Sequence, residues 1–321
     1  MTLINDAIEE VKIEEEERLK GFLAELCDPT IELDIDDIKD SDTLTKEQKE
    51  WILSKHRQSK SNSYTWGLDA IDERITTPKR GQVVLLVADE NQGKSTFCYF
   101  FARENKRKYG HEVYYINLEQ TKDEMIDAKA RQFAGVTKLQ HRDGEYLKNS
   151  KYLQKIKELR GESDINFIGR KANELTNIES VIEQVNRLEN IDFLLLDNLS
   201  CLSMRATNEN EQMKETLLKV MDLSQQKNIP IVLVHHYKKD SNDRKRLFKS
   251  TGEIKGSGYL KDLAPLIIQV TRNPDDEDPK VQDEFHIREG KLRNGDKRER
   301  VMVRHSKGDF VPDPLFGSST N

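Results

Sequence analysis

The sequence predicts an α/β protein with a doubly wound, mainly parallel sheet, helices on both faces and a C-terminal β-hairpin, preceded by a small α-helical N-terminal region. Two observations carry this prediction. Short, continuous apolar runs, as expected for parallel strands buried on both faces, alternate with helical patterns. After the last of these runs, Asn294-Gly295 separates two extended segments, which is a strong hairpin signal.

The expected strands are the six apolar runs, at residues 83–87, 113–117, 165–168, 193–196, 231–234 and 266–271. The helical patterns between them lie at residues 96–109, 122–133, 177–188 and 211–227. The hairpin strands are expected at residues 285–293 and 298–304. Because this pattern begins near residue 64, we predict one domain over residues 64–311 and a disordered tail over residues 312–321.

The region before residue 64 differs in charge from the rest. Residues 1–50 hold 17 acidic and 6 basic side chains, a balance of −11, whereas the remainder has a balance of +5. We predict an acidic helical region with a linker over residues 1–43. A second helix capped by Thr45, with a flexible joint after it, is expected over residues 44–63. The acidic end is poorly suited to contact nucleic acid, whereas the rest is suited to it.

Composition excludes several classes of protein. Charged residues make up 34% of the 321 residues, and no apolar run reaches the ~18 residues of a membrane-spanning helix. The N-terminus lacks the pattern of a secretory signal. Cys27, Cys98 and Cys201 form no C-x-x-C pair, so we expect reduced thiols in a cytoplasmic protein and no cysteine-based zinc site.

A loop between the first strand and the first helix has the pattern of a phosphate-binding (Walker A) loop. Its residues are Ala88, Asp89, Glu90, Asn91, Gln92, Gly93, Lys94, Ser95 and Thr96. Backbone N–H groups of such a loop, and the helix N-terminus after it, attract phosphates. Lys94 would bridge the β- and γ-phosphates of ATP, and Ser95 would coordinate Mg²⁺. Alanine stands where the first glycine is usual, and two acidic residues follow it. The alternative is an ordinary turn.

Three other strand ends carry side chains suited to hydrolysis. Asp197 ends an apolar strand and would hold Mg²⁺ together with Ser95. Glu119 follows the second strand, where a carboxylate can orient and deprotonate the attacking water. His236 ends the fifth strand, where it can hydrogen-bond the γ-phosphate. The alternative for each is an ordinary polar residue at a strand end, and for the adjacent His235 we favour that alternative.

Several stretches resemble one family, the RecA-like hexameric replicative DNA helicases related to DnaB, Twinkle and the phage primase–helicases. They occur in the family's order, at residues 66–72, 88–96, 117–119, 194–197, 234–236, 255–258 and 291–293. The resemblance covers roughly residues 64–309 and looks closest to the phage primase–helicase branch. Walker motifs occur in many ATPases, so the Gly-Ser-Gly stretch and the Lys-x-Arg near the hairpin are more discriminating.

The resemblance also implies roles for individual residues. Glu119 would be the catalytic base and His236 the γ-phosphate sensor. Lys291 and Arg293 would reach into the neighbouring subunit's ATP site, where an arginine stabilises transition-state charge. Arg272 would contact the nucleotide base. The alternative for Lys291 and Arg293 is a solvated hairpin edge.

A basic run follows the fifth strand. Its basic residues are Lys238, Lys239, Arg244, Lys245, Arg246, Lys249 and Lys255. In a ring, the resemblance places this run in the central channel, together with Gly256, Ser257 and Gly258. Lysines and backbone amides there can follow single-strand phosphates without reading sequence. The alternative is a solvated charge run.

The sequence therefore favours an ATP-dependent DNA helicase with ATP and Mg²⁺ as cofactors and single-stranded DNA as its track. The resemblance implies a homo-hexameric ring acting in replication, in the cytoplasm of a bacterium or of a phage-infected host. Too little chain precedes residue 64 for a primase, so the N-terminal region is a candidate site for a separate loader or primase. Two alternatives remain: a RecA-like recombination or annealing ATPase that does not unwind, and a regulatory ATPase of the KaiC/RadA kind.

Overall fold

The computed structural model describes Thr45 and residues 63–161, 165–170, 177–188, 190–202, 209–238, 247–273, 276–292, 300–306 and 309–312. The chain divides into two compact units, residues 1–62 and 63–321, and the sheet with its helices belongs to the second unit. The predicted helices and linker before residue 63 lie outside the described residues, apart from Thr45, and so do residues 313–321 of the predicted tail.

A nine-stranded sheet forms the centre of the second unit, in the order β3-β2-β4-β5-β1-β6-β7-β8-β9. The six strands from β3 to β6 are parallel, and β7 to β9 continue the sheet as an antiparallel extension. The parallel strands are β1 (Val83–Ala88), β2 (Val113–Asn117), β3 (Asn166–Ile168), β4 (Phe193–Asp197), β5 (Ile231–His236) and β6 (Leu266–Thr271). The antiparallel strands are β7 (Glu284–Leu292), β8 (Arg300–Ser306) and β9 (Asp309–Pro312).

Both faces of the parallel region are buried, as the continuous apolar runs predict. Along β1, Val84 and Leu86 point into one core, and Val83 and Leu85 point into the other. This alternation follows from the pleat of a strand, in which successive side chains face opposite sides. A strand buried on both faces needs apolar residues at every position, which explains why these strands read as unbroken runs.

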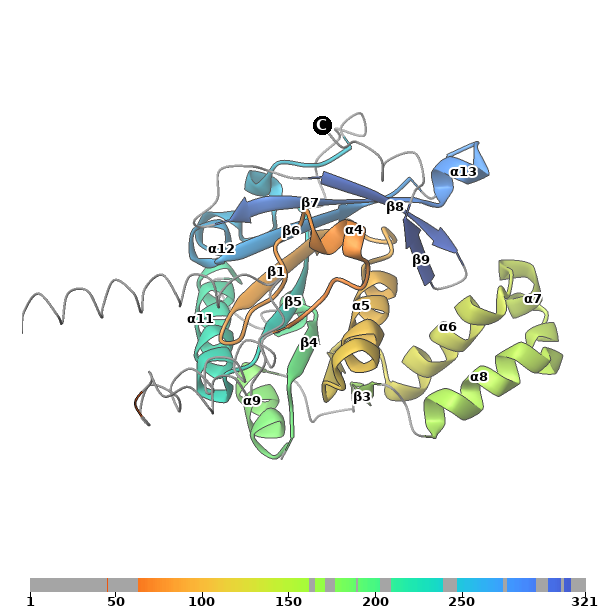
Figure 1. The fold of residues 1–321 in the computed structure, drawn as a ribbon, viewed down its shortest axis with the longest axis horizontal. Helices are drawn as coiled ribbons and strands as arrows, with labels where there is room; N and C mark the ends of the chain where they lie inside the picture. Colours follow the sequence, from red (N-terminus) through yellow and green to blue (C-terminus); the bar gives the residue numbers. More distant parts are fainter. Residues whose placement is uncertain are drawn as a thin grey trace, which may run out of the picture. The chain divides into compact units, whose positions relative to one another are not determined.

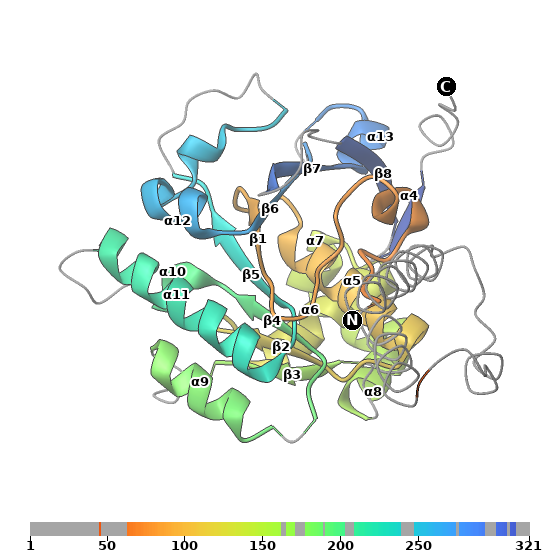
Figure 2. The same ribbon diagram turned by 60° about the vertical axis from the view of Figure 1, so that its left-hand side comes forward.

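Helices cover each face of the sheet (Figure 1). The first face is covered by α5 (Lys94–Tyr109) and α6 (Lys122–Ala134), and the second by α9 (Ile178–Asn186), α11 (Glu209–Lys227) and α12 (Ser257–Leu263). The second view agrees, with α9, α10 (Leu199–Leu202) and α11 together on one side (Figure 2). The predicted fold class, an α/β sheet with helices on both faces and a C-terminal hairpin, is confirmed.

A helical lobe extends beyond β3, and of its helices only α6 was predicted from the sequence, at residues 122–133. It contains α6, α7 (Lys138–Arg142), η1 (Glu145–Lys148) and α8 (Ser150–Arg160), and Figure 1 shows it projecting from the body. The Asn149 side chain caps α8, and the Tyr152 hydroxyl donates 2.7 Å to Asp127 of α6. Strand β9 was also missed, and it includes Pro312, which the sequence reading assigned to the tail.

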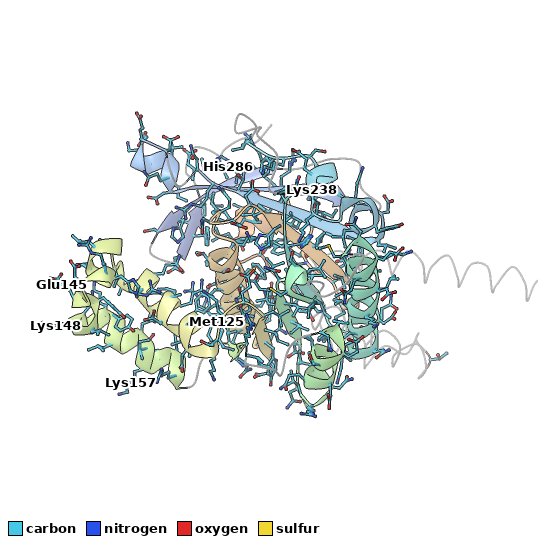
Figure 3. The ribbon with its side chains drawn as sticks, turned by 180° about the vertical axis from the view of Figure 1, so that it is seen from behind. Met125, Glu145, Lys148, Lys157, Lys238 and His286 are labelled. Carbon is cyan, nitrogen blue, oxygen red and sulfur yellow. The ribbon has the colours of Figure 1, made fainter. Side chains whose placement is uncertain are left out.

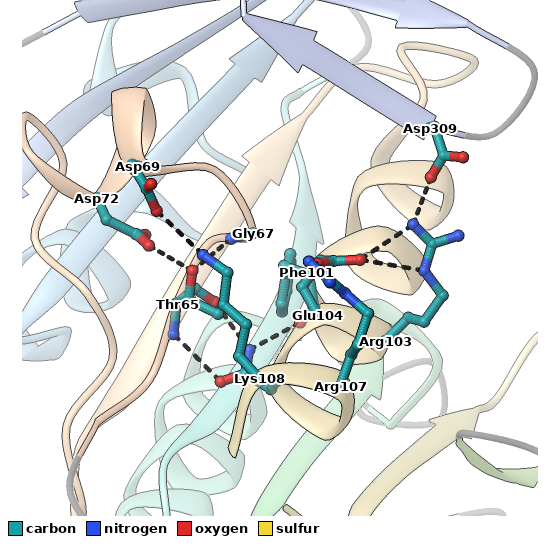
Figure 4. Close-up of polar contacts among 11 residues, drawn as sticks. Thr65, Gly67, Asp69, Asp72, Phe101, Arg103, Glu104, Arg107, Lys108 and Asp309 are labelled. Carbon is teal, nitrogen blue, oxygen red and sulfur yellow. Dashed lines mark hydrogen bonds and ion pairs between the residues drawn. The ribbon is translucent and has the colours of Figure 1, made fainter. Parts of the chain in front are cut away.

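The segment before β1 is fastened to α5. Thr65 N donates 3.1 Å to the Asn105 side-chain oxygen, and Asn105 donates back to the Thr65 carbonyl oxygen at 2.8 Å. Trp66 N donates 2.6 Å to Asp72 of the short helix α4 (Asp69–Asp72). Figure 4 shows Thr65, Asp69 and Asp72 beside α5, with Lys108 of α5 reaching Asp69. The Lys108 Nζ to Asp69 Oδ1 distance is 3.1 Å. The stretch at residues 66–72 therefore has a structural role in positioning α5.

Candidate functional site

A cavity of about 560 Å³ opens at the carboxyl edge of the parallel strands. This is the edge at which open α/β sheets bind their ligands. The residues that line it come from the last positions of β4 and β5 and from the segments after β1, β2 and β6: Glu90, Asn91, Gly93, Lys94, Ser95, Thr96, Glu119, Asp197, His236 and Arg272. The sequence reading had assigned every one of these residues to the site.

The turn at residues 89–93 depends on two unusual backbone positions. Asn91 has φ of 61°, a left-handed conformation that asparagine tolerates better than most residues. Gly93 has φ of 79°, and a Cβ atom there would lie 2.9 Å from the Phe285 ring. Ala88 is the last residue of β1, paired with His236, so this position takes an ordinary strand conformation. The alanine is therefore compatible with the turn.

The ammonium group of Lys94 lies back over this turn. Its Nζ donates to the carbonyl oxygens of Asp89 at 2.5 Å and Ala88 at 3.3 Å. Burial lowers the pKa of Lys94, and the charges of Asp197 and other nearby groups oppose that effect. The turn thus holds a buried cation beside backbone amides, an arrangement suited to an anionic ligand.

Ser95 and Asp197 meet at the floor of the cavity. The Ser95 hydroxyl donates 3.1 Å to Asp197 Oδ2, and the Tyr115 hydroxyl donates 2.8 Å to the same oxygen. Burial raises the pKa of Asp197, so a cation placed here would stabilise its charged form. Within the described part of the chain, no three His, Cys, Asp or Glu side chains form a metal cage. Mg²⁺ does not need one, because it is often held by one or two protein oxygens together with phosphates and waters.

A buried lysine of α6 contacts the backbone of Ser95 beneath the cavity. Lys129 Nζ donates 2.9 Å to the Ser95 carbonyl oxygen, and burial lowers the pKa of Lys129 to about 8. On the same helix, Gln132 donates 3.0 Å to the Thr96 hydroxyl. These contacts tie the helix that follows Glu119 to the first turn of α5.

Glu119 and His236 are brought together by a residue that the sequence reading did not select. Asn198 Nδ2 donates to Glu119 Oε1, and the same nitrogen lies 2.8 Å from His236 Nε2. His236 Nε2 and Glu119 Oε1 are 4.0 Å apart. The adjacent His235 is buried instead, with its Nε2 2.8 Å from the Lys255 carbonyl oxygen. His235 therefore satisfies polar groups inside the fold, as favoured from its position.

Arg272 closes the cavity on the β6 side. Its backbone N–H donates 2.6 Å to the Gln92 side chain, which links the loop after β1 to the end of β6. Its Nε atom is buried and has no hydrogen-bond partner among the described residues, and burial lowers the pKa of the guanidinium. Such a donor beside an open cavity suits a ligand with acceptor atoms.

Of the two residues predicted to act in the neighbouring subunit's site, only Lys291 is among the described residues. Lys291 Nζ donates to the carbonyl oxygens of Lys261 and, at 2.9 Å, Asp262, both in the last turn of α12. It is not among the residues that line this chain's own cavity. Arg293 lies outside the described residues.

The predicted nucleic-acid residues fall into three groups. Lys239, Arg244, Lys245 and Arg246 lie outside the described residues, and of Ser257 only the backbone is described. Lys238 and Gly258 are exposed, and Figure 3 shows Lys238 well apart from Lys148 and Lys157 of the helical lobe. Lys249, Lys255 and Gly256 are at least half buried. A Cβ atom on Gly256 would lie 2.7 Å from Met213 Sδ, so the packing of α12 against α11 explains why glycine occupies this position.

Comparison with known proteins assigns the family. Residues 63–308 match the family described as the DnaB-like helicase C terminal domain. The chain belongs to this family. Its recognition as a RecA-like replicative helicase domain is thereby confirmed.

Two curated relatives of this helicase domain carry the same name. The probable plasmid replicative DNA helicase of Chlamydia psittaci is 23% identical over 233 residues, which cover 68% of this chain and 48% of the relative. The protein of that name from Chlamydia trachomatis is 19% identical over 222 residues, which cover 68% of this chain and 49% of the relative. The chain thus spans about half the length of the curated relatives it matches.

Solved structures agree on the fold of the helicase domain. One of them, an ATPase domain, superposes with a TM-score of 0.67 at 16% identity, covering 84% of this chain and 99% of that one. A DnaB-like replicative helicase, studied with its primase interactions, superposes with a TM-score of 0.63 at 16% identity, covering 85% of this chain and 68% of that one. A KaiC-like protein from Pyrococcus horikoshii superposes with a TM-score of 0.53 at 15% identity, covering 79% of this chain and 99% of that one. No described helix of the helicase domain is long and apolar enough to cross a membrane.

Three site residues of this helicase domain escaped the sequence reading. Tyr115 and Lys129 lie inside an apolar strand and an amphipathic helix, where nothing local marks them as neighbours of Asp197. Asn198 could have been found from the sequence, because it is a polar residue that directly follows Asp197. A polar residue at the end of the strand between β2 and β5 is positioned to contact both Glu119 and His236, once the strand order is known.

Proposed function

We propose that this chain is the motor of an ATP-dependent DNA helicase, which assembles as a ring and translocates on single-stranded DNA in replication. The observation that carries the proposal is the convergence of Lys94, Ser95, Asp197, Glu119 and His236 on one cavity in a chain of the DnaB-like family. Phosphoryl transfer to water requires a phosphate-binding cation, metal ligands, a carboxylate and a group at the γ-phosphate.

The proposed cofactors are ATP and Mg²⁺, whose use the family implies in general. Ser95 and Asp197 would hold Mg²⁺, and the bound ion would offset phosphate charge. Lys94 would exchange its bonds to the turn's carbonyl oxygens for bonds to phosphate oxygens. The buried Arg272 Nε would find an acceptor on the nucleotide.

Within this site, the chain's own groups divide the work. Glu119 would orient the attacking water and accept its proton, because it is the carboxylate that follows β2 at the edge of the cavity. His236 would contact the γ-phosphate. Lys291 and Arg293 would act in the neighbouring subunit's site, which makes hydrolysis depend on assembly into a ring, proposed to be hexameric.

Single-stranded DNA would be bound by the basic run that starts at Lys238. That residue is exposed and is the second residue after β5, the strand that also supplies His236 to the cavity. Nucleotide state and DNA contact would therefore be linked through one strand. We place the protein in the cytoplasm of a bacterium or phage-infected host, where replication occurs, and propose the N-terminal region as the contact for a loader or primase.

Displacement of one strand from a forked DNA tests the function. We expect ATP-dependent displacement by the wild type and none by Lys94→Ala or Arg293→Ala. Lys106→Ala is a matched control, because Lys106 lies on the same helix but does not line the cavity. Its Nζ pairs with Glu112 Oε2 at a distance of 2.8 Å. That variant should unwind at the wild-type rate.

The outcomes separate the helicase from other ATPases. Hydrolysis stimulated by DNA without strand displacement would reject the helicase and support an annealing or recombination ATPase. Hydrolysis indifferent to DNA would instead favour a regulatory ATPase.

A further inference from the structure

The order of the strands places one residue between the two side chains assigned to hydrolysis. Strand β4 lies between β2 and β5, with Asn117 paired to Asp197 and Leu196 paired to Leu233. The residue after β4 is therefore flanked by the residues that follow β2 and end β5. That residue is Asn198, which is fully buried.

The contacts of Asn198 fix which way its amide points. Its Oδ1 accepts a hydrogen bond from Cys201 N at 3.3 Å, and a backbone N–H can only donate. Its Nδ2 faces Glu119 Oε1, and a carboxylate oxygen accepts. The reversed amide would place oxygen against oxygen at Glu119 and N–H against N–H at Cys201.

This orientation in turn fixes the state of His236. Because Asn198 Nδ2 donates, His236 Nε2 at 2.8 Å must be the acceptor. The imidazole is therefore neutral and carries its proton on Nδ1. In this arrangement His236 Nε2 has no proton to give to a γ-phosphate oxygen while Asn198 holds it.

We propose that Asn198 is a positioning residue that couples the γ-phosphate sensor to the catalytic base, an inference that rests on the proposed roles of His236 and Glu119. One amide nitrogen holds both side chains through its two N–H bonds, so a turn of His236 toward a phosphate removes one of the contacts that orient the amide at Glu119. Asn198 thus makes the placement of the base depend on the occupancy of the site.

Kinetics of ATP hydrolysis test the coupling. Asn198→Ala should lower kcat by about 10- to 100-fold, the range expected when a catalytic group is misplaced, and should leave KM for ATP within about twofold. Asn105→Ala is the control, since Asn105 is an equally buried asparagine that binds Thr65 and Phe101 away from the cavity. It should lower the melting temperature while preserving kcat.

A double variant separates coupling from independent action. If Asn198 couples His236 to Glu119, Asn198→Ala/His236→Ala should lower kcat by clearly less than the product of the two single losses. Multiplied losses would overturn the proposal, and so would a kcat unchanged by Asn198→Ala.

Nitrogen NMR of [¹⁵N]histidine-labelled wild type reads the same network without turnover. His236→Ala identifies the resonances. We expect an unprotonated Nε2 and a protonated Nδ1 in the nucleotide-free chain, and a protonated Nε2 would overturn the proposal. This result stands even if Asn198→Ala does not fold. Absence of ATPase in the wild type would count against the proposed function, whereas an active wild type with a protonated Nε2 would reject only the coupling.

Discussion

Asp89 and Lys249 form an ion pair between the loop after β1 and the segment that precedes η2 (Thr251–Glu253). Lys249 Nζ lies 2.9 Å from Asp89 Oδ1 and 2.8 Å from Oδ2. The Lys249 carbonyl oxygen accepts from Gln269 at 2.9 Å, so this segment is also fixed to β6. Asp89 is the first of the two acidic residues that follow Ala88 in the phosphate loop, and its charge is offset by Lys249, which was assigned from sequence to DNA contact.

This pair predicts that Lys249 affects nucleotide binding even without DNA. Lys249→Met would leave the Asp89 carboxylate unpaired near the phosphates. The KM for ATP should rise about three- to fivefold, the factor that matches the ~1 kcal/mol of a partly exposed ion pair. Asp89→Asn/Lys249→Met removes both charges and should return KM to within about twofold of wild type. A lysine that only contacts DNA would leave KM unchanged in every variant.

Gly93 should be the least replaceable residue of the phosphate loop. Gly93→Ala introduces a Cβ atom 2.9 Å from the Phe285 ring, in addition to the strain of a left-handed backbone. Gly110→Ala is a matched control, because Gly110 has φ of 70° but nothing within 4 Å of its Cβ position. Both should lose about 1–2 kcal/mol of unfolding free energy from the backbone. Gly93→Ala alone should lose further unfolding free energy, because of the clash with Phe285. It alone of the two variants should also lose nucleotide binding. Equal melting temperatures would contradict the predicted clash.

The parallel core could be predicted from sequence because its signals are local. Every residue of β1 is buried, so burial itself forces the unbroken apolar run that marks it as a strand. In the helical lobe, α6 was predicted but α7, η1 and α8 were missed, although Asn149 caps α8 and Tyr152 and Leu159 face inward. Its apolar positions are few, and exposed Leu139, Leu147 and Leu153 blur the helical period.

The site was predictable where a local motif or a residue at a strand end carries the chemistry, as at Lys94 in the phosphate loop and Asp197 at the end of β4. It was not predictable where the contact depends on strand order. Tyr115 reaches Asp197 only because β2 neighbours β4, and Asp89 meets Lys249 across 160 residues of sequence. Neither pairing leaves a pattern in either segment alone.

Because the pKa of His305 is lowered, we expect the free energy of unfolding to decrease at acidic pH. Burial, and next the nearby charge of Arg272, lower its pKa to about 4, and Gln132 Nε2 lies 3.1 Å from its Nε2. Between pH 6.5 and 4 the unfolded chain binds a proton that the folded chain does not, so stability falls as pH falls. Relative to His305→Gln, the wild type should lose about 2 kcal/mol of unfolding free energy across this window, after allowance for partial exposure. Denaturant unfolding at pH 6.5 and 4.5 measures the difference. The exposed His141→Gln is the control, and a pH-independent difference for His305→Gln would contradict the prediction.

Mixed assemblies test whether a site is completed by the neighbouring subunit. Lys94→Ala inactivates a subunit's own cavity, and Arg293→Ala removes the group that this subunit would give to its neighbour. Each variant alone should be inactive. In a random 1:1 mixture, about a quarter of the interfaces would join an intact Lys94 to an intact Arg293, so ATPase activity should return in proportion.

A matched mixture shows that any restored activity comes from such interfaces. Lys94→Ala mixed with Lys94→Ala/Arg293→Ala forms rings with no intact cavity and should stay inactive. ATPase activity, measured after co-refolding or subunit exchange, is compared with ring assembly measured by light scattering. Mixed rings that assemble but hydrolyse no ATP would place Arg293 outside the neighbour's site. Arg293→Ala that is active alone would remove it from hydrolysis altogether.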